Sequence, residues 1–212
     1  MSRSHYGVVR SEPDRPDPWD CIQALTISHY LWLDNGCTPE VNVKLYYTSE
    51  RLYLQYTVYE NDPMIQYHAM NDPVCKDSCV EFFFQPLPES DPRYLNFELN
   101  AAGTLMLKIG RDRHDRTALP NTAPSLFDIH AATGYFDPIA ASPYWQLAFS
   151  IPFDWLQTIF PDFGVKPGRK FRGNFYKCGD TTPIPHYGSW NRVSSPVPDF
   201  HRSSDFGDLE LG

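Results

Sequence analysis

The chain has 212 residues, of which 15% are aromatic, 20 are proline and 21% are charged, and its formal net charge is −8. An acidic surface repels a phosphate backbone, so nucleic acid is not expected as a partner. No basic amphipathic segment or long apolar run indicates a membrane partner. The prolines argue against coiled coils and long helices, and an apolar content of 42% argues against a disordered chain.

The chain begins with a polar, proline-rich segment, residues 1–20, which we expect to be an extended lead-in to one domain formed by residues 21–212. In 41–47 and 52–59, apolar and polar residues alternate with the period of half-buried strands. A loop with two Asn-Asp-Pro sequences, at 61–63 and 71–73, follows them. Further strands are predicted at 24–28, 78–84, 94–100, 104–109, 126–132, 145–151, 172–178, 187–191 and 206–211.

One short helix is predicted at residues 153–160. Pro152 stands at its start, where a missing N–H costs no hydrogen bond, and Pro161 ends it. About ten short strands separated by turn residues are typical of an all-β protein. The predicted fold is therefore an antiparallel β-sandwich with one short helix.

Alternation also sorts polar side chains onto one face of three predicted strands. Glu81 alternates with Val80 and Phe82, and Asn96 and Glu98 alternate with leucine and phenylalanine. Arg172, Asn174 and Tyr176 share one face of a third strand. Carboxylates, amides and a guanidinium are hydrogen-bonding groups of fixed geometry, and aromatic rings combine an apolar body with a polar tip. This set of groups suits a polyhydroxylated ligand such as a sugar.

Six short motifs occur in an order that resembles carbohydrate-binding module family 9. They are Asp-Ser-Cys-Val-Glu-Phe-Phe at 77–83, Tyr-Leu-Asn-Phe-Glu-Leu-Asn at 94–100, the segment 145–153 ending in Ile-Pro-Phe, Phe-Arg-Gly-Asn-Phe-Tyr at 171–176, Ser-Trp at 189–190 and Asp-Phe-Gly-Asp-Leu at 205–209. The resemblance implies a β-sandwich that binds mono- or oligosaccharides without cleaving them. It also implies a role in carbohydrate catabolism and a glycoside hydrolase as a partner. The chain is similar to a divergent, stand-alone member.

Carried over by motif, the family's acidic residue falls on Glu81. Its first clamping tryptophan falls on Cys75 or Val74, its second on Phe200 or His201, and its arginine on Glu98, so the usual aromatic clamp is expected to be altered. Trp19, Trp32 and Trp155 are interpreted as structural. The predicted ligand-binding residues are Glu81, Asn96, Glu98, Arg172, Asn174, Tyr176, Trp190 and Phe200, with Trp190 and Phe200 as stacking rings.

The five cysteines have no regular spacing, and Cys75 and Cys79 lack a second pair at zinc-binding distance in the sequence. They are interpreted as reduced cysteines, and no cofactor is required. The family resemblance implies structural calcium, for which Asp62, Asp72 and Asp205 are the candidate ligands.

Two alternative functions stay open. Glu81 and Glu98, on adjacent predicted strands, could serve as the carboxylate pair of a glycoside hydrolase. Met64, His68 and Met70 could instead belong to a haem-binding or protein-interaction sandwich. The N-terminus lacks the apolar segment of a signal peptide, so we expect a cytoplasmic protein, or a secreted or periplasmic one if a signal was removed.

Overall fold

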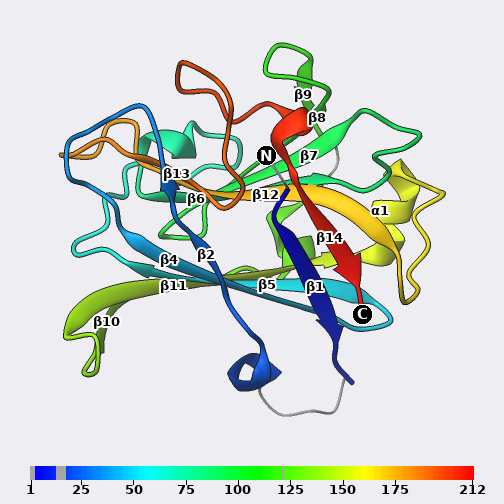
Figure 1. The fold of residues 1–212 in the computed structure, drawn as a ribbon, viewed down its shortest axis with the longest axis horizontal. Coiled ribbons are helices and arrows are strands. Elements are labelled where there is room, and N and C mark those ends of the chain that lie inside the picture. Colours follow the sequence, from blue (N-terminus) through cyan, green and yellow to red (C-terminus); the bar gives the residue numbers. More distant parts are fainter. Residues whose placement is uncertain (1–2, 13–17, 121) are drawn as a thin grey trace.

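Two layers of β-strands face each other across an apolar core in the computed structural model, which describes residues 3–12, 18–120 and 122–212 (Figure 1). The upper layer contains β3 (His29–Tyr30), β6 (Cys79–Gln85), β7 (Tyr94–Asn100), β8 (Leu105–Gly110), β9 (Arg116–Ala118), β12 (Lys170–Cys178), β13 (Tyr187–Ser189) and β14 (Gly207–Leu211). The lower layer contains β2 (Leu25–Ile27), β4 (Glu40–Tyr47), β5 (Arg51–Tyr59), β10 (His130–Asp137) and β11 (Ser142–Pro152).

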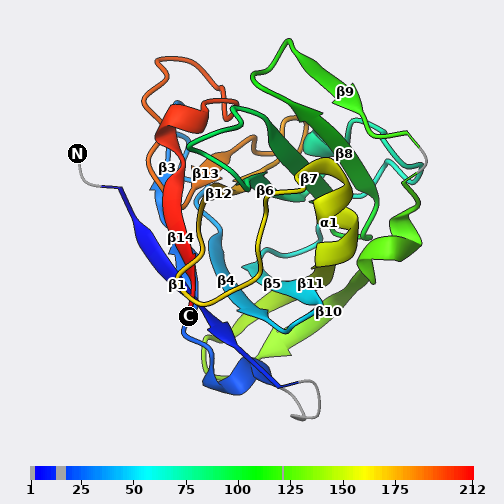
Figure 2. The same cartoon turned by 90° about the vertical axis from the view of Figure 1, so that its right-hand side faces the viewer.

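The strand β1 (His5–Arg10) joins the two layers at one edge. Its first residues pair in parallel with β14, and Val9 and Arg10 pair in parallel with β4. Hydrogen bonding therefore runs through all the strands in the order β10-β11-β5-β4-β1-β14-β12-β6-β7-β8-β9, with β2, β3 and β13 beside this path. Figure 2 shows β1 and β14 side by side at this edge.

The all-β class with one α-helix is confirmed, but two details of the prediction are corrected. The described residues form 14 strands rather than about ten, and the sheet is mixed because β1 pairs in parallel with both of its neighbours. Strands β1, β3 and β9 were not predicted, since they are short or carry few buried side chains. Residues 1–2 and 13–17 of the predicted lead-in lie outside the described residues.

The α-helix α1 (Phe153–Ile159) follows β11, with Pro152 as its N-cap residue. No helix in the described ranges is long and apolar enough to cross a membrane. The strand expected at 126–132 begins later, at His130, because Pro124–Phe127 forms a 3-10 turn that ends at the left-handed Asp128. Three further 3-10 turns are Pro18–Cys21, Val74–Lys76 and Ser203–Asp205.

Apolar side chains cover both faces of the upper layer. Between the layers, Phe82 stacks on Phe175 with ring centroids 4.8 Å apart. On the outer face, a second apolar cluster includes Phe83, Tyr94 and Phe206. All residues of β6 and β7 are consequently buried. The face predicted to be polar and open is therefore covered over most of its area by apolar side chains.

Candidate functional site

A pocket of about 240 Å³ opens on the outer face of the upper layer, and we call it the central pocket. Its polar floor includes Glu81 of β6 and Glu98 of β7, with Cys178 at the end of β12. Its other lining residues come from β8, β9, β13, the 3-10 turn Val74–Lys76 and the surrounding loops: Trp32, Cys75, Met106, Arg113, Arg116, Asp180, Tyr187, Pro198, Asp199, Phe200 and His201.

Three aromatic residues form one wall of the pocket. The ring of Trp32 lies 5.6 Å from that of Phe200 and 5.8 Å from that of Tyr187, measured between centroids. Phe200 stacks on Tyr176 at 4.0 Å, and the Tyr176 hydroxyl donates a hydrogen bond to the Phe200 carbonyl. The Trp32 indole N–H donates to the carbonyl of Ser195 at 2.7 Å. The wall is therefore held in place by contacts behind it, and Trp32 and Tyr187 remain only half-buried.

The carboxylates of the floor stand side by side, because Glu81 and Glu98 are register partners in the antiparallel pair β6–β7. Glu98 Oε1 accepts a hydrogen bond from Asn96 Nδ2 at 2.7 Å and lies 3.4 Å from a guanidinium nitrogen of Arg116. Burial raises the pKa of Glu98 to about 7, and burial together with the charge of Glu98 raises that of Glu81 well above its usual range. Near neutral pH the floor thus offers both a hydrogen-bond donor and an acceptor.

The rim of the pocket carries charges of both signs. Arg113 Nε lies 3.0 Å from Asp199 Oδ1. His201 is hydrogen-bonded through Nδ1 to the Tyr94 hydroxyl, and its pKa is lowered to about 2 by burial and by the charges of Arg116 and Arg113. His201 is therefore a neutral hydrogen-bonding group at the pH of the cell.

Three of the eight predicted ligand residues, Glu81, Glu98 and Phe200, line the central pocket. Two more lie beneath it and support it, since Asn96 binds Glu98 and Tyr176 binds Phe200. These five share the outer face of the upper layer or the loop that covers it, as alternation predicted for the strand residues.

The other three predicted residues lie elsewhere. Asn174 is buried, and its amide binds the backbone of Asn191 through both N–H and oxygen. Arg172 pairs with Asp208 at 3.2 Å on a different part of the surface. The predicted stacking ring of Trp190 belongs to the core between the layers, 5.6 Å from Phe175, which corrects its expected exposure.

The sequence interpretation missed Trp32 as a pocket residue and assigned it a structural role. Its signal was weak: an aromatic residue in a polar loop, between the short strand β3 and β4. Arg113 and Arg116 were not predicted as site residues either, because the charges of the segment 110–118 gave no indication that it reaches the floor of the pocket. Trp32 and the two arginines reach the pocket only because their segments fold over the sheet, and the local sequence does not determine this.

The candidate calcium ligands already accept hydrogen bonds from the protein, Asp62 and Asp72 within their own turns and Asp205 also from a residue eleven positions away. Asp62 accepts a hydrogen bond from Asn61, Asp72 from the backbone of His68 and Ala69, and Asp205 from Ser194 and Arg202. Calcium binding stays a prediction. Of the residues considered for haem, His68 is exposed, whereas Met70 packs against the core between the layers and the Met64 sulfur accepts from Gln66.

Comparisons with a family model and with solved structures identify similar carbohydrate-binding proteins. The family model described as carbohydrate-binding family 9 matches residues 19–211. A protein from Bacteroides uniformis ATCC 8492, described as a candidate carbohydrate-binding protein, superposes with a TM-score of 0.84 and 28% identity, covering 100% of both chains.

Two structures of a family 9 module from Caldicellulosiruptor kristjanssonii also match. The complex with glucose has a TM-score of 0.63 and 13% identity and covers 99% of this chain and 96% of that one. The complex with cellotriose has a TM-score of 0.61 and 14% identity and covers 98% and 93%. These two establish similarity of fold. The search of curated proteins finds no match.

Proposed function

The chain belongs to carbohydrate-binding family 9, and from this premise we propose that its central pocket binds one terminal sugar ring of a mono- or oligosaccharide without cleaving it. The observation that carries this proposal is the pairing of the aromatic wall, Trp32, Tyr187 and Phe200, with the carboxylate floor, Glu81 and Glu98, in one small cavity. A sugar ring presents hydroxyl groups at its edge and C–H groups on its face, so it requires both kinds of partner.

The dimensions of the pocket support a single ring. Its volume of about 240 Å³ is smaller than the roughly 300–1,000 Å³ of pockets that enclose drug-sized ligands. The ring would pack against Trp32 and Tyr187, with its hydroxyls directed at the floor and at Arg113 and Arg116. Further sugar units would extend out of the pocket into solvent. The two structures of a family 9 module from C. kristjanssonii are complexes with glucose and with cellotriose, so we propose these sugars as the first ligands to test.

Family membership favours binding over hydrolysis, and the geometry of Glu81 and Glu98 supports the same conclusion. Glycoside hydrolases place two carboxyl groups on either side of the bond that breaks. Here the two side chains leave directly opposite positions of neighbouring strands and share one floor. We therefore assign them to hydroxyl binding. A glycoside hydrolase acting on the same polysaccharide is the partner that would connect this function to carbohydrate catabolism.

Isothermal titration calorimetry with glucose and cellotriose tests the proposal. The wild-type chain is expected to bind one sugar per chain, with a Kd between about 1 µM and 1 mM. Trp32→Ala should weaken binding at least about tenfold, because aromatic contacts contribute disproportionately to recognition. Phe136→Ala is the matched control, since Phe136 is an exposed ring at 63% on β10, away from the pocket.

A panel of mono- and oligosaccharides extends the same measurement to other sugars. Absence of saturable binding for the whole panel at millimolar concentration would refute the proposal. Equal losses in Trp32→Ala and Phe136→Ala would refute the assignment to the central pocket.

A further inference from the structure

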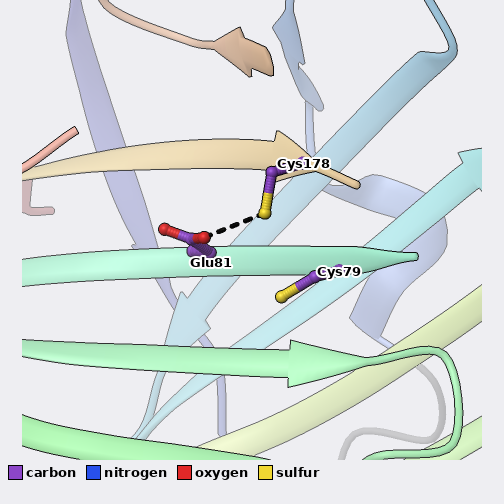
Figure 3. A group of neighbouring side chains, drawn as sticks. All are labelled: Cys79, Glu81 and Cys178. Carbon is purple, nitrogen blue, oxygen red and sulfur yellow. Dashed lines mark hydrogen bonds between the residues drawn. The ribbon is translucent and has the colours of Figure 1, made fainter. Parts of the chain in front are cut away.

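Two cysteines and a glutamate meet at the inner end of the central pocket. Cys79 of β6 and Cys178 of β12 are register partners, and Glu81 follows two residues later on the same face of β6. One ligand atom from each residue, two sulfurs and a carboxylate oxygen, lies within 4.8 Å of the others. Figure 3 shows the Cys178 side chain extending from β12 towards Glu81, with Cys79 beside it. We call these three residues the thiol–carboxylate cluster.

The cluster is buried and yet reachable. Cys79, Glu81 and Cys178 are 0%, 4% and 1% exposed, so this is not one of the exposed acidic groups that are common on protein surfaces. Glu81 and Cys178 also line the central pocket, which provides an entry path from solvent. The backbone carbonyl of Glu81 accepts a hydrogen bond from Tyr56, so the strand that carries two of the three groups is held in place.

Nearby cations do not neutralise the cluster. Arg116 pairs with Glu98, Arg113 with Asp199, and Lys177 with Glu60. In the described part of the chain, neither Glu81 nor the neighbouring Asp180 has a basic side chain within ion-pair distance. The Cys178 thiol donates instead to Glu81 Oε1 at 3.0 Å. A proton thus occupies the space between a potential sulfur ligand and a potential oxygen ligand.

The ligand set selects one class of cation. Two thiolates and one carboxylate match borderline-soft divalent ions such as zinc, whereas calcium and magnesium prefer oxygen ligands alone. Tetrahedral zinc with bonds of about 2.0–2.3 Å places its ligand atoms roughly 3.3–3.8 Å apart. The three ligand atoms lie within 4.8 Å of one another, so binding requires them to approach by at most about 1 to 1.5 Å. Three protein ligands leave a fourth position, and the central pocket, which Glu81 and Cys178 line, is the space from which a further ligand would reach it.

We propose that Cys79, Glu81 and Cys178 bind a thiophilic divalent cation of the zinc class, with its fourth coordination position open to the central pocket. Binding displaces the protons of the two thiols and of the Glu81 carboxyl group, which leave to solvent, and involves no change of oxidation state. Burial is the main reason that the pKa of Glu81 is raised well above its usual range. The site does not depend on sugar binding, because its ligands come from the protein alone.

Cobalt(II) is a suitable probe, because zinc itself has a filled d shell and gives no d–d absorption. The reduced full-length chain is first treated with a chelator and then titrated with cobalt(II). We expect one ion per chain, a thiolate-to-cobalt charge-transfer band, the strong d–d absorption of a tetrahedral site, and displacement by zinc. Cys178→Ser and Cys79→Ser should each abolish the charge-transfer band or reduce the affinity of the chain for cobalt(II) at least tenfold. Cys21→Ser, a change at an exposed cysteine in the Pro18–Cys21 turn, is the matched control and should leave it unchanged.

A second measurement uses only the wild-type chain, in case the serine variants fold poorly. Cys79 and Cys178 are buried, so their thiols react slowly with a thiol reagent. Zinc should slow the reaction of these two thiols further, whereas calcium and magnesium should not. The proposal is overturned if no charge-transfer band appears, if Cys178→Ser keeps the band with the cobalt affinity of the wild type, or if zinc slows the reaction of no thiol. It is also overturned if two of the five thiols cannot be detected before metal is added and become detectable only after reduction, since Cys79 and Cys178 would then form a disulfide. Glucose titrations on the chelator-treated protein test the pocket separately.

Discussion

The buried ion pair between Lys177 and Glu60 makes a strong prediction about stability. Lys177 Nζ is fully buried and lies 3.2 Å from Glu60 Oε2. It also contacts His186 Nε2 at 2.8 Å. Glu60 accepts further hydrogen bonds from the Trp145 indole and the Ser78 hydroxyl. This network joins residues of β11 and β12 to the segments that follow β5 and precede β6 and β13.

The substitution Lys177→Met removes the cation and leaves the carboxylate of Glu60 without one. Removing one partner of a buried pair costs about 3–5 kcal/mol, against a total stability of roughly 5–15 kcal/mol for a typical domain. The double variant Lys177→Met/Glu60→Gln removes both charges, and an amide can still bind Trp145 and Ser78. We therefore expect the double variant to recover more than half of the loss.

The cost of Lys177→Met should also depend on pH. Burial and the charge of Lys177 lower the pKa of His186 to about 4. Burial alone would raise the pKa of Glu60, but Lys177 and the hydrogen bonds from Trp145 and Ser78 lower it overall. Without Lys177, the folded variant binds protons at both groups more readily than the folded wild type does. Because protons bound preferentially by the folded state stabilise it, the penalty should shrink as the pH falls from 8 to 5.5.

Urea denaturation followed by tryptophan fluorescence at pH 8 and pH 5.5 measures these differences. The reasoning would be refuted if Lys177→Met cost less than about 1 kcal/mol at pH 8, if the double variant were no more stable than the single one, or if the penalty grew as the pH fell. If Lys177→Met is unfolded at pH 8, the double variant should still fold, and this ranking tests the same argument.

Two further predictions concern close packing and a buried hydrogen bond. Gly207→Ala should destabilise the chain by about 1–3 kcal/mol, because the new Cβ would overlap the Trp190 ring and approach the Ser4 carbonyl. Gly7→Ala is the control, since no atom lies within 4 Å of a Cβ added there. Similar shifts of the melting temperature for the two variants would contradict the packing argument. Tyr56→Phe should cost about 1–3 kcal/mol in urea denaturation, since it leaves the buried carbonyl of Glu81 without its 2.9 Å partner; an unchanged midpoint would contradict this.

Much of the fold could be predicted because strand periodicity is local. The alternation at 41–47 and 52–59 identified β4 and β5, and the prolines around 153–160 identified α1. β1 could not be identified in this way, since only Val8 of its six residues is buried and its two partners come from distant parts of the chain. Its parallel pairing, which joins the layers, follows from those partners and not from its own pattern.

For the central pocket too, the residues on strands could be predicted from local alternation, whereas those contributed by loops could not. Alternation placed Glu81 and Glu98 on the face that carries the pocket, and it grouped Asn96 with them. It could not show that Asn174 on that face is covered by the backbone of Asn191, because alternation says nothing about what packs on a face.

The sequence by itself therefore determined which side chains share a face of each strand, and with this the carboxylates available to a ligand. Only the tertiary structure decided that Trp32 meets Phe200, that Trp190 turns into the core, and that Cys178 lies opposite Cys79. The physical reason is that side-chain direction along a strand is set by the local backbone, whereas strand register and loop covering are set by contacts between residues far apart in the chain.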